Sequence, residues 1–149
     1  MRYAQRSTAV PAPRTAAQAR NHVRSLIECS RERADGTGSP SAHEALTDAL
    51  LVTSELVSNA IRHGGGLLDF SAAVVEDGLQ LVVTDASRDA PFVTPRRAGT
   101  VPVGGFGWPL VLRLARSVTI RPTEQGGKSI VAVLPLDGPV GPARASAGR

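Results

Sequence analysis

The stretch LLVTSELVSNAIRHGGG, residues 50–66, places three polar side chains four residues apart within an otherwise apolar helix pattern. Residues four apart in a helix lie one above the other, so Glu55, Asn59 and His63 form a single polar stripe. A carboxylate or an amide among packed side chains costs several kcal/mol unless another group satisfies it. We therefore expect this stripe to contact either neighbouring strands or a ligand. Three glycines after His63 end the helix, because glycine accepts the left-handed conformation found at helix C-termini.

The rest of the chain predicts two more helices and four strands around this central helix. Apolar residues recur at three- and four-residue steps in the first helix, while Ser39 or Ser41 caps the second, with Pro40 in its first turn. Two β-prone runs that flank the turn EDG predict a hairpin. The expected helices cover 15–33, 40–63 and a span that begins near 108, and the expected strands cover 67–75, 79–85, 118–122 and 128–136.

These elements indicate an α+β fold. Antiparallel hairpins covered by helices on one face form a two-layer α/β sandwich with a mixed, mainly antiparallel sheet. One face of the first strand is expected to be buried, through Leu68, Phe70, Ala72 and Val74. We expect one folded domain over 14–136, a flexible segment over 1–13 and a disordered tail over 137–149, where Gly, Pro, Ala and Arg dominate.

The positive charge of the chain is concentrated near its N-terminus. The chain has 149 residues and a formal net charge of +4. Five arginines precede the first acidic residue, Glu28, so removing residues 1–24 leaves 4 − 5 = −1. Aromatic residues, which a platform for single-stranded nucleic acid needs, make up only 3% of the chain. We therefore expect a solvated basic arm rather than a nucleic-acid-binding surface.

Two further features bear on the location of the protein. No apolar run approaches the roughly 18 residues that a membrane-spanning helix needs, and no apolar segment follows the N-terminal arginines as in a secretory signal. Cys29 is the only cysteine, which rules out an intramolecular disulfide and favours the reducing cytosol. We expect a cytoplasmic protein that does not bind membranes.

Three short motifs add polar or glycine-rich groups. Asp85 ends a strand pattern, where it either caps the following turn or accepts a hydrogen bond from an amino group such as that of adenine. GGFG at 104–107 precedes a helix, where glycines either allow the backbone to approach phosphates or act as a loop hinge. GGKS at 126–129 ends like a P-loop, but Pro122 stands where that motif needs glycine and a strand pattern follows, so it indicates a hairpin turn.

The first two members of the polar stripe suit two different tasks. Asn59 offers a neutral oxygen, which Mg²⁺ accepts as a ligand, and Glu55 can take a proton from an attacking hydroxyl or water. The alternative is that neighbouring strands satisfy both side chains.

In their order along the chain, these motifs resemble those of the GHKL ATPases, the superfamily of gyrase, heat-shock chaperone, histidine kinase and mismatch-repair ATPases. They are most similar to the motifs of small bacterial anti-sigma-factor serine kinases, and the resemblance covers about 15–136. It implies the Bergerat ATP-binding fold, with ATP and Mg²⁺ as ligands. The motifs are SELVSNAIRHG at 54–64, VVTD at 82–85, GFGWPLV at 105–111 and GGKSIVAVLP at 126–135.

The resemblance implies a role for each motif residue. Asn59 would coordinate Mg²⁺ and Glu55 would act as the catalytic base, while 86–104 would form the ATP lid. The residues implied to line the nucleotide site are Arg62, His63, Asp85 for the adenine amino group, Gly105 and Gly107 for the phosphates, and Ser129 in place of the usual threonine.

One motif departs from the family pattern, which has glycines where this chain has Ser87 and Asp89. The resemblance therefore leaves two functions open. The first is an ATP-dependent serine/threonine kinase that binds a sigma factor and phosphorylates its antagonist protein. The second is a non-catalytic regulatory module that binds nucleotide weakly or not at all. The resemblance also implies a homodimer as one state of the chain.

Overall fold

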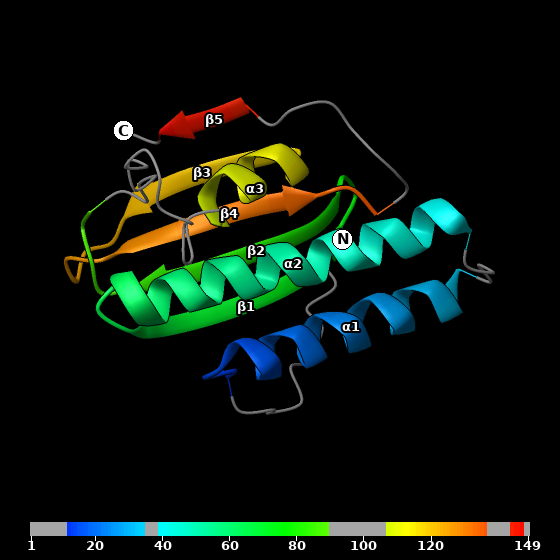
Figure 1. Cartoon of the computed structure of the whole chain (residues 1–149), viewed down its shortest axis with the longest axis horizontal. Helices are drawn as coiled ribbons and strands as arrows, with labels where there is room; N and C mark the ends of the chain where they lie inside the picture. Colours follow the sequence, from blue (N-terminus) through cyan, green and yellow to red (C-terminus); the bar gives the residue numbers. More distant parts are fainter. Residues whose placement is uncertain (1–11, 35–38, 90–106, 137–143, 148–149) are drawn as a thin grey trace, which may run out of the picture.

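The computed structural model describes residues 12–34, 39–89, 107–136 and 144–147, the last range as backbone only. Two helices come first, α1 (Ala16–Arg33) and α2 (Pro40–His63), followed by strands β1 (Leu67–Val75) and β2 (Gly78–Asp85). Helix α3 (Gly107–Leu114) precedes β3 (Ser117–Pro122), β4 (Lys128–Leu134) and β5 (Arg144–Ala147). Figure 1 shows α1 and α2 running side by side. None of the helices in these ranges is both long enough and apolar enough to cross a membrane.

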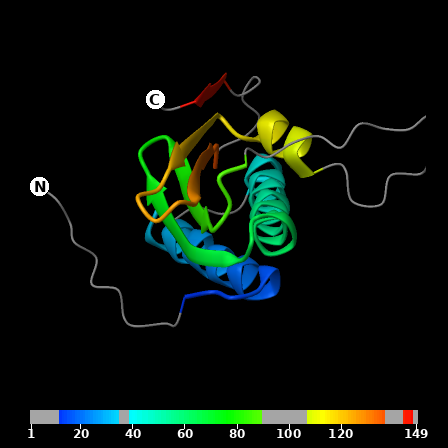
Figure 2. The same ribbon diagram turned by 90° about the vertical axis from the view of Figure 1, so that its left-hand side faces the viewer.

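The strands form one sheet in the order β1-β2-β4-β3-β5. The β1–β2, β2–β4 and β3–β4 pairs are antiparallel, whereas β5 pairs with β3 in parallel. The helices α1, α2 and α3 lie on one side of the sheet (Figure 2). The expected α+β sandwich, with a mixed and mainly antiparallel sheet, is therefore confirmed.

The core lies between the helices and the inner face of the sheet, where alternate residues of β2 and β4 are buried. From the helix side, α1 contributes Ala19, Val23 and Ile27. Burying a side chain of the size of valine or leucine contributes about 1.5–3 kcal/mol relative to its exposure. The same inner face ends in two charged residues, Asp85 on β2 and Lys128 on β4, and both are buried. The apolar residues that the two strands bury are Leu79, Leu81, Val83, Ile130, Ala132 and Leu134.

Helix α2 begins and ends as its sequence predicts. Of the two serines expected to cap it, Ser39 does so, accepting a hydrogen bond from the Ala42 amide at 3.1 Å. At the other end, Gly65 has a φ of +71°, which a residue with a side chain rarely adopts. The Gly66 amide donates to the Ala60 carbonyl at 3.1 Å, so the chain turns sharply from α2 toward β1.

The C-terminal segment differs from its prediction. The tail over 137–149 is expected to be disordered, but Arg144–Ala147 forms β5 and pairs with β3. A short strand needs only backbone partners, and the outer edge of β3 offers a row of unpaired amide and carbonyl groups. The flexible segment predicted for 1–13 lies almost wholly outside the described residues and stays a prediction.

Strand β1 is also less buried than its alternating pattern predicts. Leu68 is 59% exposed and Val74 is 39% exposed, so the covered residues of this face are Phe70 and, in part, Ala72. The β1–β2 register shifts at the start of the strand, where an irregular residue interrupts the alternation of faces. As the first strand in the sheet order, β1 has one neighbouring strand, β2, among the strands that the structure describes.

Candidate functional site

Glu55 and Asn59 lie on α2 where the first residue of α3 packs against it. This residue, Gly107, is buried, and a Cβ atom there would collide with Oε2 of Glu55 and lie 3.4 Å from Nδ2 of Asn59. Both polar side chains are half-buried. Within the described part of the chain, neither of them has a hydrogen-bond partner. Neighbouring strands in these residues therefore do not satisfy the two side chains, which leaves their polar groups able to bind a ligand.

The first turn of α3 adds partial positive charge to this site. The first amide groups of a helix have no partner within the helix, and the helix dipole points its positive end there. A phosphate or carboxylate is stabilised at such a position. Because Gly107 has no side chain, the backbone of α3 comes close to the polar stripe of α2. The site thus combines a carboxylate, an amide and a helix N-terminus.

Asp85, at the end of β2, contacts protein groups rather than solvent. Its side chain is 4% exposed and that of Lys128 is 7% exposed. The Lys128 ammonium lies 2.9 Å from Oδ2 of Asp85 and donates to Oδ1 at 3.0 Å. The Ser87 amide also donates to Oδ1 at 3.0 Å, so Asp85 caps the following turn, which was one of its two expected roles. The charge of the carboxylate is therefore balanced within the fold.

Two glycines close the space around Asp85. A Cβ atom at Gly64, which ends α2, would lie 2.6 Å from Cγ and from Oδ2 of Asp85. A Cβ atom at Gly127 would collide with the backbone carbonyl of Asp85. The Ala86 amide donates to the Gly64 carbonyl at 2.8 Å, which holds the end of α2 against the end of β2. Along the axis of α2, Glu55 lies about 14 Å from Gly64, so Glu55 and the residue packed against Asp85 are more than two helical turns apart.

Ser129 is not brought to this site. Successive side chains of a strand point to opposite faces of the sheet, and Lys128 takes the inner face, opposite Asp85. Ser129 therefore points to the outer face, where its hydroxyl lies 2.7 Å from that of Thr84. Lys128 is a buried site residue that is not among those predicted from the sequence, although the sequence carries a signal for it. Lys128 shares the two-residue period of the buried apolar side chains of β4, beginning with Ile130.

The remaining predicted site residues lie at the end of α2 or outside the described residues. Arg62 and His63 occupy the last turn of α2, and both are exposed. Gly105 and most of the lid predicted over 86–104 fall within 90–106, which the structure does not describe. The two glycines of the GGKS motif lie in the turn between β3 and β4, so the expected hairpin is confirmed.

Where the family pattern has two glycines, hydrogen bonds hold the segment that follows β2. The Asp89 amide donates to the Ser87 hydroxyl at 3.1 Å. The Lys128 ammonium donates to the Ser87 carbonyl at 3.3 Å, and Nε of Arg88 donates to the Gly126 carbonyl at 3.2 Å. These bonds tie the segment to β4 and to the β3–β4 turn, whereas glycines would leave it freer to move.

The two ends of the site differ in how well they suit a nucleoside triphosphate with Mg²⁺. At the α3 end, the oxygen of Asn59 and the helix N-terminus suit a metal-bound phosphate, because Mg²⁺ is usually held by one or two protein groups together with phosphates and water. The described ranges contain no cluster of three or more His, Cys, Asp or Glu that could hold a metal ion. At the other end, the carboxylate that an adenine amino group would need is bound to Lys128. The phosphate end fits the ligand, whereas the base end would receive an adenine amino group only if that group displaced the Lys128 ammonium.

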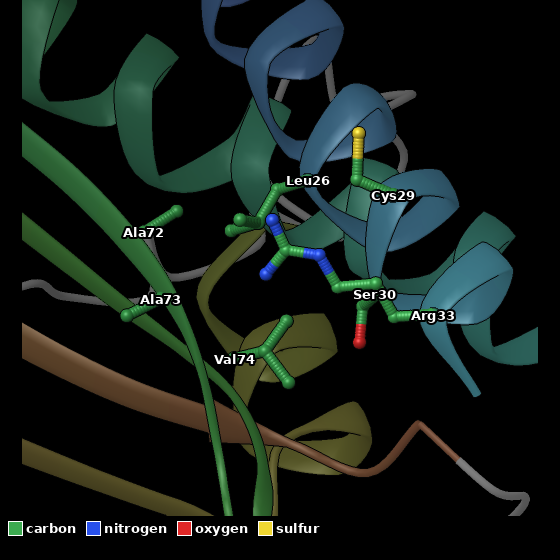
Figure 3. A pocket seen from close by; sticks show the side chains of 7 residues that line it. All are labelled: Leu26, Cys29, Ser30, Arg33, Ala72, Ala73 and Val74. Atoms are coloured by element: carbon green, nitrogen blue, oxygen red, sulfur yellow. The ribbon is translucent and has the colours of Figure 1, made fainter. Parts of the chain in front are cut away.

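A separate cavity lies between α1 and β1 (Figure 3). Its volume is about 520 Å³, and the side chain of Arg33 extends across it from α1. This cavity shares no residue with the polar stripe or with the Asp85–Lys128 pair, so it is not part of the candidate nucleotide site. It is lined by Leu26, Cys29, Ser30, Arg33, Ala72, Ala73 and Val74.

One of the comparisons with known proteins matches a part of the chain that contains both ends of the candidate site. The searches of curated proteins and of solved structures gave no match. A family profile described as the histidine kinase-like ATPase domain matches residues 9–134, which include α1 through β4 and hence both ends of the site. The chain therefore belongs to the family of histidine kinase-like ATPase domains.

Proposed function

We propose that the protein is an ATP-binding regulator of the anti-sigma-factor type, which phosphorylates a serine or threonine of a small antagonist protein and also binds a sigma factor. The observation that carries this proposal is the position of Glu55 and Asn59 against the first residue of α3. Among the described residues their half-buried polar groups have no hydrogen-bond partner, and they stand beside a helix N-terminus, which suits the positioning and charge neutralisation on which phosphoryl transfer depends.

Glu55 and Asn59 have distinct roles in this proposal. Asn59 would offer its side-chain oxygen to Mg²⁺, and the amides of the first turn of α3 would face the phosphates. Glu55 would hold the hydroxyl of the incoming serine or threonine and accept its proton. When bound, ATP supplies the phosphoryl group that the hydroxyl receives. The family membership of the chain supports this assignment of the ligand.

Transfer of labelled γ-phosphate from ATP to an anti-sigma-factor antagonist tests this function. Glu55→Gln removes the proton acceptor and keeps the shape of the side chain, so labelling is expected to fall by about 10²-fold or more. Glu76→Gln makes the same chemical change in the exposed turn between β1 and β2 and is expected to label like the wild type. Equal labelling by the wild type and by Glu55→Gln would show that Glu55 is not the base.

A second function, a non-catalytic regulatory module, is favoured by a different observation. The carboxylate of Asp85 is bound to Lys128, and hydrogen bonds hold the segment at Ser87 and Asp89 where the family has glycines. A module of this kind would dock its partner without nucleotide. Calorimetry with ATP, ADP and Mg²⁺ separates the two functions, because the module predicts neither binding heat nor a thermal shift at millimolar nucleotide.

A further inference from the structure

The Asp85–Lys128 ion pair occupies both oxygens of the carboxylate that the family resemblance assigns to adenine. Oδ1 accepts from Lys128 at 3.0 Å and from the Ser87 amide at 3.0 Å, and Oδ2 lies 2.9 Å from the same ammonium. Both side chains are more than nine-tenths buried. An amino group that reached Asp85 would therefore have to displace the Lys128 ammonium.

The surroundings of the pair leave little room for a third group. Gly64 lies against Cγ and Oδ2 of Asp85, so closely that a single added carbon would meet them at 2.6 Å. Gly127 packs against the backbone carbonyl of Asp85 on another side. The Lys128 ammonium is itself held by a third contact, with the Ser87 carbonyl at 3.3 Å. The carboxylate and the ammonium thus form one closed unit between α2, β2 and β4.

We infer that Lys128 sets the base specificity of the site, because its ammonium takes the hydrogen-bonding place on Asp85 that an adenine amino group would fill. This inference rests on the proposed function only in taking a nucleotide as the ligand. Adenine presents an amino donor where guanine presents a carbonyl acceptor. A free carboxylate binds the donor and repels the acceptor, whereas a carboxylate neutralised by lysine distinguishes the two bases poorly. If the wild-type chain binds nucleotides, we therefore expect Asp85 not to select the base, so that adenine and guanine nucleotides bind with similar affinity.

Calorimetric titration with non-hydrolysable ATP and GTP analogues, each with Mg²⁺, tests this inference on three forms of the full chain. Lys128→Met keeps an unbranched side chain but removes the ammonium group and shortens the chain by one atom, which frees the carboxylate of Asp85. The double variant Asp85→Asn with Lys128→Met removes both charges and serves as the matched control. Thermal unfolding of each form, with and without analogue, establishes that the protein is folded.

The wild type is expected to bind the two analogues about equally. Lys128→Met is expected to bind the ATP analogue at least about tenfold more tightly than the GTP analogue, and the double variant is expected to lose that preference. A wild type that prefers ATP about tenfold, with the preference lost in the double variant, overturns the inference, because Asp85 would then select the base with Lys128 in place. This outcome is available even if Lys128→Met does not fold.

The proposed function can fail separately from this inference. A wild type that binds neither analogue and transfers no phosphate contradicts the kinase proposal. If Lys128→Met then gains selective binding of the ATP analogue, the inference stands, because removal of the lysine has allowed Asp85 to select adenine. A folded Lys128→Met that gains no preference for ATP overturns the inference, whatever the wild type binds.

Discussion

The carboxylate of Glu55 on α2 lies against the backbone of Gly107, the first residue of α3. Helix α3 comes this close because position 107 carries no side chain. The Glu55 carboxylate thereby stands beside the positive end of a helix dipole, and the residue is only partly buried. The position of the Glu55 carboxylate, the proposed base, thus depends on the close packing of Gly107 at the start of α3.

A methyl group at position 107 is expected to move Glu55 without unfolding the protein. The atom that a Cβ would meet is the far end of a flexible side chain, and Gly107 has no positive φ, so alanine is allowed there. Gly107→Ala should leave the melting temperature nearly unchanged and lower phosphoryl transfer about tenfold or more, as misplacement of a catalytic group does. The labelling assay and a thermal melt measure the two effects. Combined with Glu55→Gln, the substitution should add little further loss, since both act through one carboxylate.

Gly64→Ala is expected to destabilise the fold. Its Cβ would meet Asp85 at 2.6 Å, and that side chain is held in place by Lys128 and Ser87. The φ of Gly64 is −93°, so the cost comes from steric overlap and not from the backbone. Overpacking of this kind costs about 1–3 kcal/mol, which denaturant unfolding can measure. An unfolding midpoint equal to that of the wild type would show that Asp85 can move away from α2.

Truncation of Ile27 tests whether α1 is part of the single core. Ile27 is 1% exposed, and Ile27→Ala is expected to lower the free energy of unfolding by about 2–5 kcal/mol. Ile61 on α2 is 46% exposed, so Ile61→Ala removes the same atoms and is expected to change stability by less than about 1 kcal/mol. Equal effects in urea unfolding would mean that α1 does not pack as described.

Asp48 is expected to reduce stability at neutral pH. Burial raises the pKa of Asp48 above its ordinary value of 3.8, and the negative charge of Glu44, one turn earlier on α2, raises it further. The folded state therefore binds the Asp48 proton more tightly than the unfolded state does, and its contribution to stability falls as pH rises from 3.8 through the raised pKa. Asp48→Asn should raise the melting temperature by a few degrees near neutral pH.

The pH dependence of this gain distinguishes the cause. At pH values below 3.8 the carboxyl is protonated in both states, so the advantage of Asp48→Asn should disappear. Asp69→Asn, at an exposed position of β1, is the control and is expected to behave like the wild type at both extremes. A gain that persists unchanged into acid would show that the charge of Asp48 is not responsible.

The helical part of the fold follows from local patterns in the sequence. The apolar period of α2, its Ser39 cap and the glycines after His63 are all short-range signals, and the structure agrees with each of them. The spacing of Glu55 and Asn59 also predicts correctly that both lie on one face, where a Cβ atom at Gly107 would meet both side chains. These features need no knowledge of which segments meet in space.

The features that the sequence did not reveal depend on strand register and on distant pairing. A shift of one residue moves a side chain to the other face of a sheet. The prediction placed Ser129 in the site, but Ser129 lies on the outer face and its neighbour Lys128 lies on the inner face, opposite Asp85. The neutralisation of Asp85 depends on that register across two strands 43 residues apart in the chain. β5 was missed because its pairing with β3 rests on backbone groups, which no side-chain pattern records.

The parallel pairing of β5 with β3 covers the outer edge of β3. Without β5, the outer edge of β3 would expose unpaired amide and carbonyl groups. Such an edge can pair with a strand of another copy of the protein and so promote aggregation. A shortened chain that stops at residue 136 would keep α1, α2, α3 and the strands β1 to β4. We expect it to self-associate more than the full chain at high protein concentration. We therefore expect removal of β5 to lower the solubility of the protein, because the edge of β3 would then be unpaired.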